Sequence, residues 1–341
     1  MRPKKIIIEK DVAALKISKN IISKYNYAPV SFVDRVKLGK DKYSKDDLVI
    51  AKQRGRFVKR CPGTPAYNCC QYHVLNVGIG CETGCTYCFL HHYMNTPFIV
   101  YANIDDLISE VEAVCADSQN KILRIGTGEF IDSIGFDDLT DLNKILVPKL
   151  SAISNIALEI KTKSKKVDSL LDLDHQGRVV ISWSLNSQTV ADKEEPEADP
   201  IMDRIFAAKR AQEAGYSVGF HFDPLIYYSG WKDDYGKVVD QIFSTIDPAG
   251  IAWISLGALR FNPGLKPIIK LKFPKSKIVY QEMVPGLDGK LRYFISIRKL
   301  LFERMTFNIR SYSKKIPVYL CMEKNELAKE LGLIANFNLN S

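Results

Sequence analysis

Between residues 72 and 272, short apolar runs alternate with amphipathic stretches. The runs are rich in Val, Ile and aromatic residues, which favour strands, and the stretches between them have helical periodicity. This alternation predicts a parallel β-sheet with helices between its strands. The predicted strands are residues 74–78, 122–127, 156–162, 179–185, 218–222 and 251–256.

The clearest predicted helices are residues 105–115, 137–150 and 199–215. In the last of these, Asp199 is the expected N-cap and Pro200 lies in the first turn. Successive βα units predict an α/β fold built as a partial (β/α)6 barrel of the TIM type. The loops that follow the carboxyl ends of the strands are then expected to carry the functional site.

The chain divides by composition into three parts. Residues 1–70 form a basic N-terminal region, residues 71–272 the predicted barrel, and residues 273–341 a C-terminal hairpin and tail. The basic region includes residues 40–42 and 52–60, whose cations are interpreted as a solvated surface rather than as phosphate contacts.

An Asp288-Gly289 pair between two alternating segments predicts a β-hairpin. Its return strand carries Arg292, Tyr293 and Arg298. One face of the hairpin could therefore offer phosphate contacts and a stacking ring to a nucleic acid. A plain edge hairpin is an equal alternative.

The 341 residues are 46% hydrophobic, enough to form one large core and to exclude a disordered chain. Lys and Arg outnumber Asp and Glu by 48 to 39, which gives a net charge of +9. The resulting pI near 9.0 is compatible with a polyanionic partner, although many soluble proteins are equally basic.

No apolar run reaches the roughly 18 residues that a membrane span needs, and the first residues do not resemble a signal peptide. We therefore expect a cytoplasmic protein with no membrane association. The cytoplasm keeps thiols reduced, so the eight cysteines are expected to serve a metal or a reaction rather than a disulfide framework.

Three cysteines follow the first predicted strand at the spacing C-x3-C-x2-C: Cys81, Cys85 and Cys88. Three thiolates on one loop can bind three irons of a [4Fe–4S] cluster and leave the fourth iron open to another ligand. Structural zinc is the alternative. It requires four ligands, and a fourth sulfur could come from Cys61 or from the adjacent Cys69 and Cys70.

This motif, with Tyr87 just before its third cysteine, resembles the signature of the radical S-adenosylmethionine (SAM) superfamily. Gly126 and Gly128, followed by Glu129, look like the Gly-Gly-Glu element of the same superfamily. The resemblance implies that S-adenosyl-L-methionine binds the open iron, with Glu129 receiving its ammonium group. It also implies a 5′-deoxyadenosyl radical and a reducing partner such as flavodoxin or ferredoxin.

From about residue 70 to 300 the chain is similar to the spore photoproduct lyase family, notably over residues 163–172, 182–186 and 214–220. The resemblance implies a carbon–carbon lyase that splits a methylene-bridged thymine dimer in UV-damaged DNA after the bases flip out. It also implies that Lys163 and Ser184 contact SAM. Lys161, on the same face of the predicted strand, is an alternative to Lys163.

Two positions depart from the best-known members of that family. Glu129 stands where their hydrogen-donor cysteine is expected, and Phe89 replaces the tyrosine that assists it. Gly-Thr-Gly-Glu is instead typical of the spore-photoproduct-lyase-like branch. Cys321 is the candidate replacement donor, with an inert buried cysteine as the alternative, and Cys115 is interpreted as core.

His221 and Asp223 end the fifth predicted strand and could position SAM or the substrate, or could simply fix the following turn. Three hypotheses for the function result. The first is a DNA-repair lyase. The second is a radical SAM enzyme acting on a modified RNA base, a peptide or a small molecule. The third is a non-catalytic, zinc-stabilised nucleic-acid-binding protein.

Overall fold

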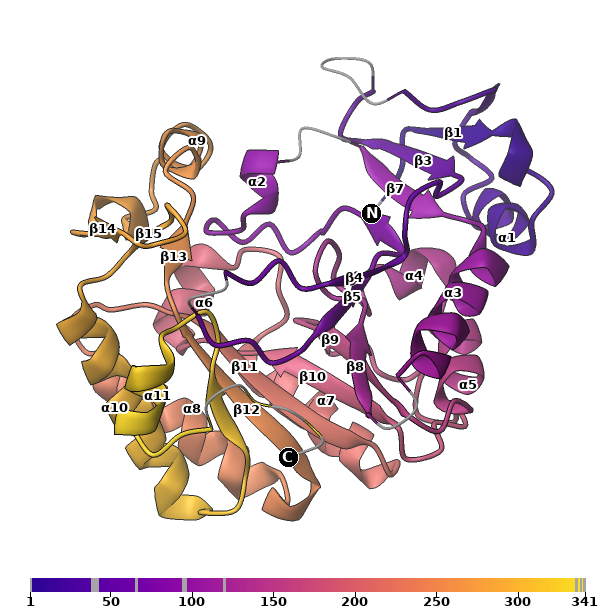
Figure 1. Cartoon of the computed structure of the whole chain (residues 1–341). Helices are drawn as coiled ribbons and strands as arrows, with labels where there is room; N and C mark the ends of the chain where they lie inside the picture. The colour runs from indigo at the N-terminus through magenta and orange to yellow at the C-terminus, as the bar shows by residue number, and fades with distance from the viewer. Residues whose placement is uncertain are drawn as a thin grey trace.

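The computed structural model describes residues 2–37, 43–64, 67–93, 97–118, 121–334, 337 and 339. The basic segment at residues 40–42 lies outside these ranges. Figure 1 shows an α/β molecule in which a curled sheet occupies the centre and helices cover its outer side. None of the helices in the described ranges is both long enough and apolar enough to cross a membrane.

The central sheet is a half-barrel with the strand order β16-β12-β11-β10-β9-β8-β5-β4. All its neighbouring strands are parallel except β4 and β5. All six residues of β10 are buried, as expected for a parallel strand covered on both faces. The strands are β4 (Val58–Arg60), β5 (His73–Leu75), β8 (Leu123–Gly126), β9 (Ile156–Thr162), β10 (Val179–Ser184), β11 (Ser217–Leu225), β12 (Ile251–Ala258) and β16 (Val318–Leu320).

The predicted partial barrel is therefore confirmed, and each predicted strand is found within a few residues of its expected bounds. The predicted helix at 137–150 is instead two helices, because Asp141 between them has a left-handed φ of 52°. The helices around the half-barrel are α3 (Ile104–Ala116), α4 (Asp137–Thr140), α5 (Asn143–Ser151), α6 (Gln188–Glu194), α7 (Ile201–Glu213), α8 (Trp231–Thr245) and α10 (Ile295–Tyr312).

Asp199 is not the N-cap of α7, as the sequence predicted, because Pro200 occupies that position. Its carboxylate instead accepts hydrogen bonds from the Ser164 hydroxyl and from the backbone N–H of Lys165. The side chain thus fixes the loop that follows β9 rather than the start of the helix.

A second sheet, with the order β2-β1-β3-β7-β6, joins three strands of the basic N-terminal region to β6 and β7, which come after residue 70. Its buried Ile and Val side chains continue into the main core, so the region is folded structure rather than a simple leader. In Figure 1 it lies beside the end of the half-barrel to which the strands point. Its elements are β1 (Lys5–Glu9), η1 (Lys10–Val12), α1 (Lys16–Lys24), β2 (Val30–Val33), β3 (Asp47–Ala51), β6 (Gly78–Ile79), α2 (Leu90–Tyr93) and β7 (Phe98–Tyr101).

The predicted turn at Asp288-Gly289 is present, but its return strand is much shorter than expected. Strand β15 stops at Arg292, and Arg298 lies in helix α10. The three-stranded sheet has the order β13-β15-β14. The remaining elements of this part are η2 (Pro248–Gly250), β13 (Arg260–Phe261), α9 (Leu265–Lys272), η3 (Ile278–Tyr280), β14 (Val284–Pro285), β15 (Leu291–Arg292) and α11 (Asn325–Glu330).

A buried arginine joins the two sides of the half-barrel. Arg124 of β8 forms an ion pair of 2.8 Å with Glu159 of β9 and donates a 2.8 Å hydrogen bond to the hydroxyl of Tyr319 on β16. Its guanidinium also lies 4.0 Å from the ring centre of Trp253, a cation–π distance. Burial alone raises the pKa of Glu159, but Arg124 and His221 outweigh it and hold this pKa well below its ordinary value.

We expect Arg124→Met to lower the free energy of unfolding by about 3–5 kcal/mol, because it leaves the buried Glu159 carboxylate without its cation. The double variant Arg124→Met/Glu159→Gln should recover part of this loss, since no buried charge then lacks its partner. Urea denaturation followed by circular dichroism measures both. If Arg124→Met and the wild type have the same urea midpoint of unfolding, Arg124 does not stabilise the half-barrel in this way.

Candidate active site at the carboxyl ends of the barrel strands

The strand ends of the half-barrel gather the predicted site residues. The parallel register sets Gly126 beside Glu159, Lys161 beside Ser182 and Ser184 beside His221, so consecutive strands end next to one another. The cysteine loop follows β6 at the same end. Residues far apart in sequence thereby meet around one opening.

The cysteine loop is tightly turned around Thr83. The sulfur of Cys81 lies 3.0 Å from the Thr83 hydroxyl oxygen, and the thiol of Cys85 donates to the same oxygen at 3.6 Å. The backbone N–H of Cys88 then donates to the carbonyl of Cys85 at 3.0 Å. Burial raises the pKa of all three thiols, to about 12 for Cys88.

These residues fit an iron–sulfur cluster. Three free thiols converge on one loop, and each thiolate of a cubane binds a different iron, so the sulfurs need not meet at one point. Among the described residues, no three His, Cys, Asp or Glu side chains are arranged to hold a single metal ion. Burial, and to a lesser extent Glu129, raises the pKa of the fourth-ligand candidate Cys61 to about 12.

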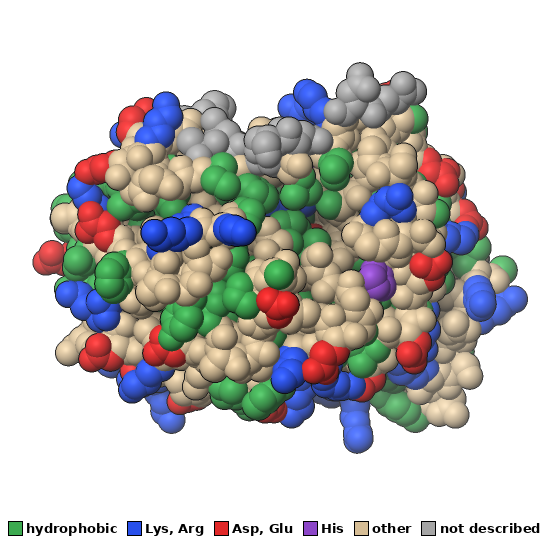
Figure 2. Space-filling view, turned by 90° about the horizontal axis from the view of Figure 1, so that it is seen from below, with side chains coloured by type: hydrophobic (Ala, Val, Ile, Leu, Met, Phe, Trp, Pro, Cys, Tyr) green, Lys and Arg blue, Asp and Glu red, His purple; other side chains and the backbone are tan. Residues whose placement is uncertain are grey.

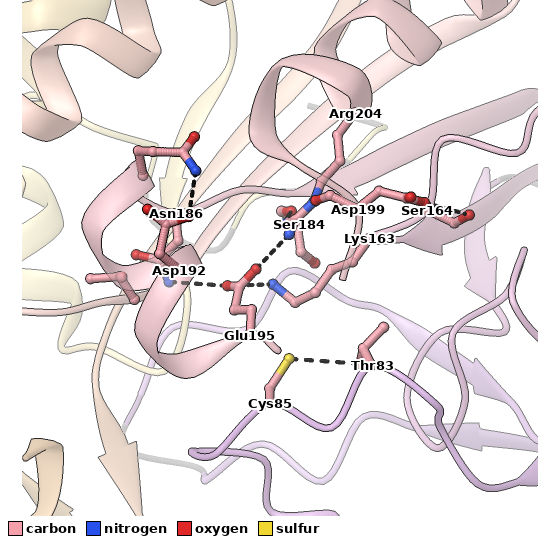
Figure 3. Close-up of polar contacts among 12 residues, drawn as sticks. Thr83, Cys85, Lys163, Ser164, Ser184, Asn186, Asp192, Glu195, Asp199 and Arg204 are labelled. Atoms are coloured by element: carbon pink, nitrogen blue, oxygen red, sulfur yellow. Dashed lines mark hydrogen bonds and ion pairs between the residues drawn. The ribbon is translucent and has the colours of Figure 1, made fainter. Parts of the chain in front are cut away.

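A buried carboxylate, that of Glu195, connects the cysteine loop to the barrel (Figure 3). Tyr87 of the loop donates its hydroxyl to Glu195. Lys163, just after β9, forms an ion pair of 2.9 Å with the same carboxylate, and Arg204 of α7 forms another of 2.8 Å. The Lys163 ammonium also lies 5.9 Å from the ring centre of Tyr87. Burial opposes ionisation of Glu195, but Lys163 and Arg204 outweigh it and lower its pKa to about 2.

Sequence reasoning missed both Glu195 and Arg204. A buried arginine in a helix has no signature of its own, and Glu195 belongs to a charged stretch, Lys193-Glu194-Glu195, that is typical of a solvated surface. Ser184 is buried, and its carbonyl accepts a 2.9 Å hydrogen bond from Arg204.

The two glycines before Glu129 allow other side chains to approach the backbone closely. A Cβ atom on Gly126 would lie 2.5 Å from the Tyr72 hydroxyl oxygen, and one on Gly128 would lie 2.6 Å from the Cβ of Lys161. Any larger residue would push these side chains away. Burial raises the pKa of Glu129, which Lys161 opposes. Lys161 therefore faces Glu129, whereas Lys163 faces Glu195 and the cysteine loop.

A second charged group lies across the opening. Arg260 binds both carboxylate oxygens of Asp223, at 2.9 and 3.0 Å, and its guanidinium donates to the sulfur of Cys321 at 3.5 Å. Burial and Asp223 raise the pKa of Cys321 well above its ordinary value, which keeps this group a neutral thiol. Sequence reasoning identified Asp223 and Cys321 but not Arg260.

His221 is buried on β11. It makes a 2.7 Å hydrogen bond with Glu159, and burial lowers its pKa to about 4. His221 therefore belongs to the Arg124 and Glu159 network that closes the barrel. Cys115 is buried on α3, as predicted.

The three residues predicted to contact nucleic acid are engaged inside the protein. Arg292 is paired with Asp288, and Arg298 is paired with Glu323 at 2.7 Å. Tyr293 is only 1% exposed. Their side chains stabilise the three-stranded sheet and the start of α10, so the interpretation of this face as a DNA-contacting surface is wrong. Alternation could not reveal this, because strand β15 ends at Arg292 and a helix begins three residues later.

Comparison with known proteins identifies the family of this chain. The sequence model described as "Spore photoproduct lyase" matches residues 35–292, which include the cysteine loop and all the strand ends that surround it except β16. The chain belongs to the spore photoproduct lyase family. Members of this family are radical SAM enzymes with a [4Fe–4S] cluster, which accounts for a three-cysteine motif at the end of a half-barrel.

Curated spore photoproduct lyases are distant relatives. The protein from a Geobacillus strain is 27% identical over 214 residues, which cover 62% of this chain and 63% of the relative. The protein from Bacillus subtilis is 28% identical over 207 residues, which cover 60% of each chain. The aligned part of this chain thus spans about three-fifths of these relatives.

Solved structures match over more of the chain. A spore photoproduct lyase complexed with dinucleoside spore photoproduct has a TM-score of 0.81 at 22% identity and covers 94% of this chain and 99% of that one. A double variant with bound AdoMet and the same dinucleoside has the same TM-score and identity. At this identity the likeness establishes the fold that the chain shares with the spore photoproduct lyase family.

We expect Glu195→Gln to loosen the cysteine loop, because it leaves Lys163 and Arg204 without their shared anion. The free energy of unfolding should fall by about 3 kcal/mol. After anaerobic reconstitution, iron–sulfur absorbance should decay faster under a chelator than in the wild type. Glu197→Gln, an exposed change two residues later, is the matched control. Equal decay in Glu195→Gln and the control would show that Glu195 does not hold the loop.

Proposed function

We propose that the protein is a radical SAM carbon–carbon lyase that splits a methylene-bridged thymine dimer in UV-damaged DNA. The observation that carries this proposal is the family match across residues 35–292, which contain the three-cysteine loop at the barrel opening. When bound, the cluster and SAM supply a 5′-deoxyadenosyl radical that can remove a hydrogen atom from the lesion. Flavodoxin or ferredoxin is the proposed reductant.

In this proposal Cys81, Cys85 and Cys88 hold the cluster. The Tyr87 and Glu195 contact fixes their loop against the barrel, and Lys163 is oriented by Glu195 toward the same opening. Ser184 lies at the end of the next strand, and its predicted role is to contact SAM. The carboxylate of Glu129 is the proposed acceptor for the ammonium group of SAM. Gly126 and Gly128 leave room for the backbone to come close to it.

Cys321 is the proposed hydrogen donor. It directly follows β16, and Arg260 and Asp223 hold its sulfur in place. A hydrogen-atom donor must be a thiol rather than a thiolate, and the raised pKa of Cys321 meets that requirement. The S–H bond breaks as a C–H bond forms on the substrate radical. One electron from the protein reductant and one proton then restore the thiol.

A second candidate function keeps the radical chemistry and changes the substrate. Glu129 and Phe89 stand where the resemblance led us to expect the donor cysteine and its tyrosine. A modified RNA base, a peptide or a small molecule would then replace the thymine dimer. We favour the DNA lesion because Cys321 offers a thiol at the opening in place of the missing one.

The test is to incubate the anaerobically reconstituted protein with dithionite and SAM, with and without a spore-photoproduct dinucleotide. Mass spectrometry then follows 5′-deoxyadenosine and thymine-containing products. Lesion-dependent release of two thymines is the expected result. Formation of 5′-deoxyadenosine with the lesion left intact would retain the radical chemistry and reject this substrate.

We expect Cys321→Ser to abolish more than nine-tenths of the repair while leaving SAM cleavage near the wild-type rate, because hydrogen return follows SAM cleavage. Cys115→Ser, on a helix outside the opening, is the control and should repair normally. Cys61→Ser tests the rival thiol beside Glu129. Full repair by Cys321→Ser, or loss of repair only in Cys61→Ser, would show that Cys321 is not the hydrogen donor.

A further inference from the structure

The segment from residue 248 to residue 281 contains no Asp or Glu, although it contains five lysines and Arg260. Arg260 forms an ion pair with Asp223. The lysines lie on α9 and on the residues leading to η3. This segment is one of the two longest stretches of the chain without Asp or Glu, and residues 48–81 form the other, of equal length.

Four of these lysines are exposed to solvent: Lys270, Lys272, Lys275 and Lys277. Two large side chains among them are exposed as well, Leu271 at 83% and Tyr280 at 57%. We call these six residues the α9 surface. Solvated lysines are ordinary, but lysines interspersed with an exposed aromatic ring and an exposed leucine form a typical nucleic-acid contact surface.

The ring of Tyr280 lies close to two of the lysines. The ammonium groups of Lys270 and Lys277 are 4.8 and 5.7 Å from its centre, within cation–π distance. Two cations are therefore held close to an exposed ring. Such an arrangement can bind two phosphates while the ring contacts a sugar or a base between them.

Lys272 has another cation near it. This cation is Lys45, which belongs to the turn before β3. The nearby Asp46 forms an ion pair with Lys4. The side chain of Asp47 accepts a hydrogen bond from the backbone N–H of Ser44. Burial and Lys45 lower the pKa of Lys272. Two like charges this close are unfavourable unless an anion joins them.

The α9 surface is attached to the cysteine loop. The ring of Phe273 lies 5.0 Å from that of His91, and His91 bonds to the carbonyl of Cys85 at 3.0 Å. Ser276 donates to Glu194, which also accepts from Thr86 of the loop. In Figure 1, α9 and α2 stand together at the end of the molecule where the strands end. An anion bound here would lie beside the opening.

Other lysines near the opening are paired. Lys163 binds Glu195, Lys165 binds Asp203 and Lys166 binds Asp138. On the underside of the molecule, Lys and Arg side chains are mixed with Asp and Glu (Figure 2). The α9 surface differs from both, because within its own segment no carboxylate competes for its cations.

We propose that the α9 surface binds the phosphate backbone of the DNA strand that flanks the lesion. This inference rests on the proposed function and adds the surface that would hold the DNA at the barrel opening. It also replaces Arg292, Tyr293 and Arg298, which are buried. An acidic redox protein is the competing occupant. The exposed ring and leucine among the cations favour DNA, because they match a sugar and base edge between phosphates.

The test compares the triple variant Lys270→Gln/Lys272→Gln/Lys277→Gln with the wild-type protein. The probe is a fluorescent 20-base-pair duplex without a lesion, titrated at several salt concentrations. Each lost phosphate contact should reduce the slope of log K against log salt by about 0.9, so the slope should fall by roughly 2 to 3. At low salt the affinity should fall roughly tenfold or more.

The matched control removes three exposed lysines at the other end of the barrel, Lys121, Lys314 and Lys315. It changes the net charge equally and should leave most of the affinity and slope intact. Equal losses in the two triple variants would mean that only overall charge matters, and unchanged binding by the α9 variant would mean that the surface does not contact DNA. Either result overturns the proposal.

Two further measurements separate this proposal from the proposed function and from the competing partner. Repair of a dinucleoside lesion, which lacks flanking phosphates, should be normal in the α9 variant. If the wild-type protein does not repair the dinucleoside lesion either, the proposed function is wrong. The duplex-binding measurement then still tests whether the α9 surface binds DNA. Slower cluster reduction by flavodoxin, with unchanged duplex binding, would instead assign the surface to a redox protein and overturn the proposal.

Discussion

The active-site end of this protein depends on one buried carboxylate. Glu195 is bonded to Tyr87 of the cysteine loop, to Lys163 after β9 and to Arg204 of α7. A buried anion of this kind is stable only if cations surround it, and those cations then have fixed positions. The same contacts that compensate the charge thus hold a short, glycine-containing loop, with its three thiols, against a rigid sheet.

The opening of the barrel has two chemically different sides. On one side Lys163, Glu195 and the cysteine loop form a charged group suited to a cofactor. On the other, Arg260 and Asp223 hold the neutral thiol of Cys321. Lys161 lies on β9 and Lys163 just after it, yet the two side chains face different sides of the opening.

The cationic side chains of this protein occupy two distinct environments. Arg124, Arg204, Arg292 and Arg298 are buried and paired, so they are structural. The lysines of α9 remain exposed and lack acidic neighbours in their segment. The planar guanidinium suits fixed, multiple hydrogen bonds in the interior, whereas the hydrated ammonium remains in solvent. The net charge of +9 is therefore a poor guide to a DNA surface unless the exposed cations are counted separately.

The sequence by itself determined the features that depend on neighbouring residues. Apolar periodicity identified the barrel strands, and the spacing of Cys81, Cys85 and Cys88 identified the cluster loop. Tertiary structure decided which distant groups meet. It paired Glu195 with Lys163 and Arg204, brought Cys321 to Arg260, and buried Arg292 and Arg298 that alternation had placed on a surface. Periodicity and spacing are local properties, whereas ion pairs and burial depend on contacts between segments that the chain order does not specify.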